Sequence, residues 1–226
     1  MDSTLWDEMD AFIAETLLPA DPALDAAIEA NRAAGLPAID VSPAQGKLLH
    51  LFARMIGARR VLEIGTLGGY STICLARALP DDGLVVTLEA DADHAAVARK
   101  NIDAAGQGAK VDIRVGPALH SLPGLEGEGA FDLFFMDADK ANISAYVDWA
   151  LRLARVGSVI VVDNVVRKGA VLDPASENAD AQGARRFFLE AGRQVRLCAT
   201  AIQTVGVKGW DGFAIGIVEK PVTPRR

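Results

Sequence analysis

Residues 60–71 read RVLEIGTLGGYS, an apolar run that enters a turn with three glycines in five positions. A buried strand followed by a glycine-rich turn and a helical pattern is typical of the first unit of an open α/β sheet. The same alternation of strand and helix continues to residue 163. Strands are predicted at residues 60–65, 84–89, 111–115, 131–137 and 158–163, separated by helices that include 71–79, 93–105 and 143–153. Five such strands predict a parallel, Rossmann-like doubly wound α/β sheet with helices on both faces.

The pattern changes after Asn164. A loop over residues 165–180 leads to a predicted helix at 184–190, and two strands follow at 195–203 and 212–219. The link between these two strands is too short for a parallel crossover, so they should form an antiparallel hairpin. The complete sheet is therefore expected to have seven strands.

Three helices are predicted before the first strand, over residues 5–18, 21–34 and 42–57. The first two lie outside the repeating pattern, and the sheet does not require their apolar faces. The sequence predicts one domain over residues 1–226, with residues 1–40 as a helical cap and residues 41–226 as the α/β core. The cap should cover a substrate pocket or a partner subunit.

Composition excludes several classes of protein. Half of the 226 residues are hydrophobic, which excludes a disordered chain. The net charge of -7 and the aromatic content of 6% argue against a nucleic-acid partner. The acidic N-terminus has no signal-peptide pattern, and no apolar run approaches the about 20 residues needed to cross a bilayer. We expect a cytoplasmic protein that does not bind membranes.

The glycine turn predicts a nucleoside-containing cofactor. Glu89 follows the turn by about 20 residues, the spacing at which an acid accepts ribose hydroxyls. Two details favour S-adenosylmethionine over NAD. Leu67 occupies a position where the NAD turn needs glycine, and the Glu63 carboxylate would repel a pyrophosphate but suits a ligand with an ammonium and a sulfonium. A plain tight turn with Glu89 as a helix cap would give the same pattern without a ligand.

Acidic residues also end the fourth and fifth predicted strands. Asp137 follows one strand, and Asp163 with Asn164 follows the next, so their side chains can converge at one edge of the sheet. Two carboxylates and an amide oxygen suit a hard cation: Mg²⁺ fits best, with Mn²⁺ and Ca²⁺ as alternatives. Lys140 lies three residues beyond Asp137, where a cation would disfavour its charged form and make it a candidate general base. For a single Asp, helix capping is the commoner role, so the prediction depends on the residues occurring together.

These motifs together resemble the cation-dependent class I S-adenosylmethionine O-methyltransferases, the group that contains the catechol and caffeoyl-coenzyme A O-methyltransferases and small bacterial relatives. The resemblance covers residues 41–219. It is carried by VSPAQG at 41–46, EIGTLGGYS at 63–71, GPA at 116–118, FDLFFMDADK at 131–140 and VDN at 162–164.

The resemblance implies a role for each matching position. Lys140 would be the catalytic base. Asp137, Asp163 and Asn164 would hold the metal, and the cofactor would contact Val41, Glu63, Gly65, Thr66, Ser71, Glu89, Ala118 and Asp137. Relatives of this kind are commonly homodimers, so a homodimer is expected.

The sequence is therefore interpreted as a Mg²⁺-dependent O-methyltransferase that acts on a small aromatic with two adjacent oxygens. Two alternatives stay open: an NAD-dependent oxidoreductase, and a noncatalytic module that binds a nucleoside cofactor. The loop over residues 165–180 matches no acceptor-specific pattern, so the natural acceptor is not predicted.

Overall fold

The computed structural model describes residues 3–220. The chain divides into two compact units, Met1–Gly124 and Leu125–Arg226. The seven strands form a mixed sheet that is mostly parallel and has antiparallel C-terminal strands, which confirms the predicted fold class. The division into a 1–40 cap and a 41–226 core stays a prediction.

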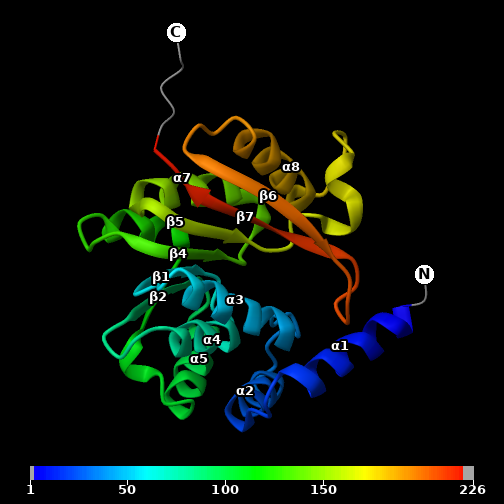
Figure 1. The fold of residues 1–226 in the computed structure, drawn as a ribbon, viewed down its shortest axis with the longest axis vertical. Helices are drawn as coiled ribbons and strands as arrows, with labels where there is room; N and C mark the ends of the chain where they lie inside the picture. Colours follow the sequence, from blue (N-terminus) through cyan, green and yellow to red (C-terminus); the bar gives the residue numbers. More distant parts are fainter. Residues whose placement is uncertain (1–2, 221–226) are drawn as a thin grey trace. The chain divides into compact units, whose positions relative to one another are not determined.

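The first unit contains three parallel strands in the order β3-β2-β1. Figure 1 labels the neighbouring strands β1 and β2. Its elements are α1 (Ser3–Leu17), α2 (Pro22–Ala33), α3 (Pro43–Met55), β1 (Arg60–Ile64), α4 (Tyr70–Ala78), β2 (Leu84–Glu89), α5 (Ala92–Ala104), η1 (Gly108–Lys110), β3 (Val111–Val115), α6 (Ala118–Ser121) and η2 (Leu122–Leu125), the last of which continues into the second unit. In register, Leu62 pairs with Val86, which in turn pairs with Asp112.

Local signals in the sequence explain where the first helices begin. Asp21 caps α2 by accepting a hydrogen bond from the Leu24 amide at 3.2 Å. Ser42 and Gln45 form a reciprocal capping box at the start of α3, with Pro43 in its first turn. These caps place Val41 immediately before α3, where its side chain is buried.

The second unit contains four strands in the order β4-β5-β7-β6. β4 and β5 are parallel, whereas β7 pairs antiparallel with both β5 and β6. Its elements are β4 (Phe131–Met136), η3 (Lys140–Asn142), α7 (Ile143–Leu153), β5 (Ala154–Val162), η4 (Arg167–Leu172), α8 (Ala179–Ala191), β6 (Leu197–Thr204) and β7 (Asp211–Val218). Every residue of β4 is buried.

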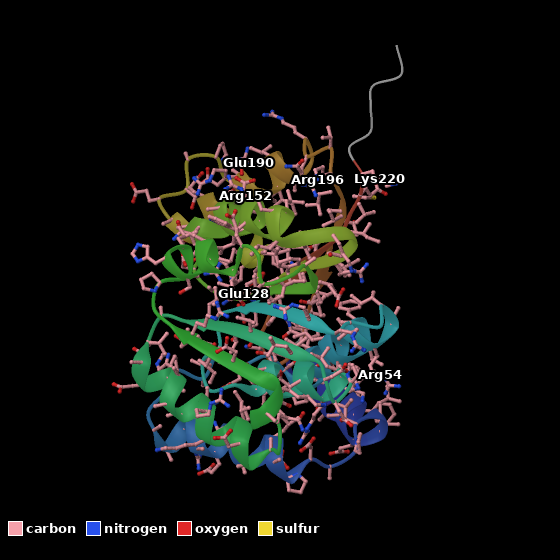
Figure 2. All side chains as sticks on the ribbon, turned by 90° about the vertical axis from the view of Figure 1, so that its left-hand side faces the viewer. Arg54, Glu128, Arg152, Glu190, Arg196 and Lys220 are labelled. Carbon is pink, nitrogen blue, oxygen red and sulfur yellow. The ribbon has the colours of Figure 1, made fainter. Side chains whose placement is uncertain are left out.

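Charged side chains lie mainly outside the cores of the two units, as for exposed Arg54 and Glu190 (Figure 2). Between residues 3 and 220 no helix is both long and apolar enough to span a membrane.

Most predicted boundaries agree with the structure within one or two residues, but two differ by more. β5 begins at Ala154 rather than residue 158, because Arg155 pairs with Asp132 of β4 and the Ser158 hydroxyl donates to the Phe131 carbonyl at 2.7 Å. α8 begins at residue 179 rather than 184, because the Asn178 side chain caps the Ala181 amide at 3.0 Å. In both cases, polar residues extend an element beyond its apolar pattern.

Candidate cofactor and metal sites

The turn after β1 has an unusual backbone. Gly65, Leu67 and Gly69 have φ angles of 98°, 49° and 88°, all in the region that favours glycine. Leu67 carries a side chain in that conformation, which costs of order 1–3 kcal/mol and persists only where neighbours hold it. Gly69 then begins α4 without a side-chain cap. The first N–H groups of any helix lack partners within the helix, so a helix start of this kind suits a polar ligand.

Glu89, at the end of β2, holds this turn. One carboxylate oxygen accepts hydrogen bonds from the amides of Thr66 at 3.0 Å and Leu67 at 2.8 Å. The other accepts from the Asp91 amide at 3.0 Å. The structure therefore brings together Thr66 and Glu89, two residues predicted to bind the cofactor.

Glu63, at the end of β1, is enclosed by hydroxyl groups. Its side chain is 0% exposed and accepts hydrogen bonds from Ser71 at 2.6 Å, from Thr87 at 2.7 Å and from Thr72. These bonds satisfy a buried carboxylate and join β1, β2 and α4. The predicted pair of Glu63 and Ser71 is thus in direct contact. Ala118 lies at the start of α6 and is half-buried.

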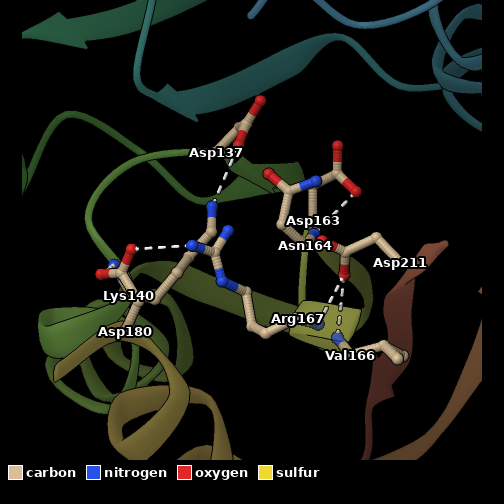
Figure 3. Close-up of polar contacts among 8 residues, drawn as sticks. All are labelled: Asp137, Lys140, Asp163, Asn164, Val166, Arg167, Asp180 and Asp211. Carbon is tan, nitrogen blue, oxygen red and sulfur yellow. Dashed lines mark hydrogen bonds and ion pairs between the residues drawn. The ribbon is translucent and has the colours of Figure 1, made fainter. Parts of the chain in front are cut away.

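The predicted metal ligands Asp137, Asp163 and Asn164 follow paired strand ends. Met136 of β4 pairs with Val162 of β5, and the Asp163 amide donates to the Met136 carbonyl at 3.0 Å. Figure 3 shows Asp137 and Asp163 beside each other in the second unit. Asp163 is only 3% exposed, and its Oδ1 accepts a hydrogen bond from the Asn164 amide at 2.8 Å.

Lys140 joins the same cluster. Its side chain is buried, and its Nζ lies 3.0 Å from Asp137 Oδ1 (Figure 3). Burial and the negative charge of Asp137 raise the pKa of Asp163 to about 6. Two clustered carboxylates with a single lysine leave excess negative charge, which favours a cation.

The raised pKa predicts how pH affects stability. Because the folded-state pKa of Asp163 lies above its ordinary value of 3.8, its contribution to stability is present at low pH and is lost as the pH rises through 6. Without metal, the Asp163→Asn variant should gain about 1–3 kcal/mol in unfolding free energy over the unaltered protein between pH 4.5 and 8. Urea denaturation in EDTA measures this difference, with Asp148→Asn as a control on an exposed aspartate. An equal pH dependence of the unfolding free energy in all three proteins would contradict the raised pKa of Asp163.

Sequence reasoning missed the residues that support this cluster. Asp180, near the start of α8, accepts a hydrogen bond from the Lys140 amide at 3.2 Å and pairs with Arg167 at 3.1 Å (Figure 3). Gly183 lies so near the Lys140 carbonyl that a Cβ would approach its oxygen to 2.0 Å. α8 therefore packs directly on the backbone of the candidate base. In the sequence, Gly183 just before the predicted helix at 184–190 was the one sign that another segment packs closely there.

Asp211 supports the loop that follows Asn164. Asn164, Arg167 and Lys168 all have φ angles between 53° and 55°, a conformation that side chains rarely adopt. Asp211, the first residue of β7, accepts hydrogen bonds from the amides of Val166 at 3.0 Å and Arg167 at 2.9 Å (Figure 3). A strained loop is thus held next to the candidate metal ligands.

Comparison with known proteins identifies the family. The O-methyltransferase family matches residues 20–206. This chain belongs to the O-methyltransferase family. A relative from Mycobacterium tuberculosis named catechol O-methyltransferase is 58% identical over 211 residues, covering 93% of this chain and 95% of that protein. The match confirms the predicted enzyme class, so neither the oxidoreductase nor the noncatalytic module is favoured.

Two solved structures that are similar to this chain contain a bound cofactor. The Bacillus cereus O-methyltransferase in complex with SAH has a TM-score of 0.95 and 50% identity, covering 96% of this chain and 100% of that chain. The O-methyltransferase TomG from Streptomyces achromogenes, in complex with SAM, has a TM-score of 0.94 and 47% identity, covering 97% and 100%. The fold similarity therefore extends over nearly the whole length of each protein.

Proposed function

We propose that this O-methyltransferase transfers a methyl group from S-adenosylmethionine to one hydroxyl of a small aromatic with adjacent oxygens, with Mg²⁺ as the bound cation. The observation that carries this proposal is the cluster of Asp137, Lys140 and Asp163, in which a buried lysine adjoins two acidic residues at paired strand ends. An O-methyltransferase needs a proton acceptor and a means of stabilising the reacting oxygen, and this cluster can provide both.

For the cofactor, the proposed residues in the first unit come from the turn after β1 and its surroundings: Val41, Glu63, Gly65, Thr66, Ser71, Glu89 and Ala118. Relatives solved with SAM and SAH support S-adenosylmethionine as the methyl donor. Glu63 near the end of β1 and Glu89 at the end of β2 are acidic, which suits a ligand that carries a sulfonium and an ammonium.

For the metal, the residues present fit a hard cation. No group of three His, Cys, Asp or Glu side chains suited to a metal occurs in the described part of the chain, so Asn164 would be the third protein ligand beside Asp137 and Asp163. Their donor atoms are all oxygens, which Mg²⁺ prefers. Asp163 is buried beside the carboxylate of Asp137, so a bound cation would offset the repulsion between the two negative charges.

The roles of the chain's own residues then follow. When bound, a cation would supply positive charge that holds adjacent acceptor oxygens and lowers the pKa of the reacting hydroxyl. Asp137 orients the lysine amine through its 3.0 Å contact. Asp180 fixes the lysine backbone. Lys140 accepts the proton of the acceptor hydroxyl at Nζ, and the protein's remaining task is to align that oxygen with the methyl group.

Glu89→Ala should weaken cofactor binding. The substitution removes the proposed acceptor of the ribose hydroxyls and both hydrogen bonds to the turn amides. We expect a loss of about 1.5 to 3 kcal/mol in the binding free energy of S-adenosylmethionine, the range for hydrogen bonds to charged groups. Calorimetric titration measures it, with exposed Glu126 changed to Ala as the control. Unchanged affinity in Glu89→Ala would defeat the assignment of this site.

The acceptor is proposed to be a catechol or caffeoyl-type compound. This proposal rests on the catechol O-methyltransferase named above and on a maize relative named caffeoyl-CoA O-methyltransferase 2, which is 38% identical over 134 residues, 58% of this chain and 51% of that protein. A mass-spectrometric screen for the gain of one methyl group tests it across catechols and matched monophenols. Methylation confined to compounds with a single hydroxyl would contradict it.

We further propose a homodimer that uses α1. Three apolar side chains on this helix, at helical spacing, are unusually exposed: Leu5 at 61%, Met9 at 52% and Phe12 at 59%. An apolar stripe of this kind marks an interaction surface. The cytoplasmic location and the absence of nucleic-acid and membrane partners stay predictions from the sequence.

The double substitution Met9→Glu and Phe12→Glu should convert the dimer to a monomer, because it places two charges on the proposed interface. Light scattering measures the mass in solution. Glu8→Gln, an exposed change on the same helix, is the control. A dimer of unaltered stability in the double variant would exclude α1 from the interface.

A further inference from the structure

Two buried asparagines lie against the glycine turn that follows β1. Asn31 belongs to α2 and is 3% exposed, and Asn101 belongs to α5 and is 7% exposed. Buried amide groups need hydrogen-bond partners, so the partners of these two side chains show what they hold in place.

The two amides form a continuous chain of hydrogen bonds within the first unit. Asn101 Nδ2 donates to the Gly68 carbonyl at 2.9 Å and to Asn31 Oδ1 at 2.9 Å. Asn31 Nδ2 donates in turn to Asp40 Oδ1 at 2.9 Å. The chain therefore links the glycine turn to the residue that precedes Val41, across α5 and α2.

Gly68 is shaped for this contact. A Cβ built on Gly68 would lie 1.8 Å from Asn31 Oδ1 and 2.1 Å from Asn31 Cγ. The side chain of Asn31 thus occupies the space that any larger residue at position 68 would need. Gly68 serves close packing, whereas its neighbours Gly65 and Gly69 serve positive φ angles.

The turn needs support from both sides. Leu67 is held at a φ of 49°, and Glu89 binds the amides of Thr66 and Leu67 from the β2 side. Asn101 binds the carbonyl of Gly68 and completes the hold on the Leu67–Gly68 segment. Without that bond, the strained turn would have one fewer constraint against relaxing to a commoner conformation.

We propose that Asn31 and Asn101 are positioning residues for the cofactor, acting through the backbone of residues 67–68 and through the side chain of Asp40, which precedes Val41. The inference rests on the proposed function, in which this turn and Val41 bind S-adenosylmethionine. It makes α2 a structural part of the cofactor site, whereas the sequence predicted only a cover for the acceptor or a partner.

The test compares SAH binding by the full-length unaltered protein with binding by Asn31→Ala and Asn101→Ala. Each variant should raise the Kd for SAH by about 10- to 100-fold, the effect of losing one or two buried hydrogen bonds. The KM for S-adenosylmethionine should rise by a similar factor, while kcat at saturating cofactor stays within about threefold, since the residues act on binding. Asn101→Asp keeps the shape but removes the donor, so it should bind no better than Asn101→Ala.

A stability control separates positioning from general weakening. Val85 lies at 0% exposure near the start of β2, away from the turn. Val85→Ala should lower the unfolding free energy but leave the Kd for SAH within about twofold. Hydrogen exchange should quicken over residues 62–72 in the asparagine variants and stay unchanged there in Val85→Ala.

The outcomes are distinct. Failure of the unaltered protein to bind SAH would overturn the proposed function, and this inference with it. Normal binding by the unaltered protein together with equal Kd values in the folded asparagine variants would overturn the inference alone. Should Asn101→Ala not fold, Asn31→Ala decides, because alanine is favourable within α2. Weakened binding in Val85→Ala to the same degree would also overturn it, because loss of stability would then explain the effect.

Discussion

Asp163→Ala is expected to abolish methyl transfer while leaving the sheet folded. Asp163 is buried at the end of β5 beside Asp137, and its carboxylate is proposed to hold the cation that activates the acceptor. Loss of one of three protein ligands should remove nearly all metal binding. Exhaustive chelation of the unaltered protein should have the same effect, and added Mg²⁺ should restore activity only in the unaltered protein. Activity assays and circular dichroism measure the two properties separately.

The matched control is Asp148→Ala, which removes an exposed aspartate from α7. This variant should keep its activity and its response to chelation. Full activity of the unaltered protein after exhaustive chelation would place it among the metal-independent methyltransferases. Isothermal titration with Mg²⁺ adds a readout that does not depend on turnover, since Asp163→Ala should show no saturable binding.

Lys140→Ala is expected to lower kcat by about 10²- to 10⁴-fold, the usual contribution of a general base. The effect should be incomplete, because the cation would share the work of deprotonation. Raising the pH from 7 to 9.5 should partly restore turnover, since a phenol with a pKa near 10 then ionises more readily without help. The assay uses a catechol and its monophenol counterpart across this range.

Lys100→Ala, an exposed lysine on α5, is the control for loss of one positive charge. A pH profile of Lys140→Ala that matches the unaltered protein would remove this lysine from the mechanism. Equal rates on the catechol and the monophenol would refute binding of two adjacent oxygens, whatever the result for Lys140.

Much of the fold could be predicted from sequence, because the strands are apolar and short. β2 and β3 begin and end at the predicted residues, as does α7. The position of the acidic residues could also be predicted, because a residue that ends a parallel strand lies at the carboxyl edge of the sheet. For this reason Asp137 and Asp163 could be placed together from two separate motifs.

Tertiary structure alone decided which strand of the hairpin pairs with β5. The second strand, β7, takes that position and leaves β6 at the edge. The apolar pattern predicted a hairpin but did not say which of its two strands pairs with β5. The placement brings Asp211, at the start of β7, to the amides of Val166 and Arg167.

The order of strands and helices along the chain, the glycine turn, and the residues proposed to bind cofactor and metal could all be predicted from the amino-acid sequence. Only the tertiary structure showed what supports them, since Asp180 lies 40 residues from Lys140 and Asn101 lies 70 residues from Asn31. The physical reason is that backbone hydrogen bonds and apolar burial leave periodic patterns in a sequence. A single buried side-chain hydrogen bond leaves none, because its partner is set by how distant elements pack.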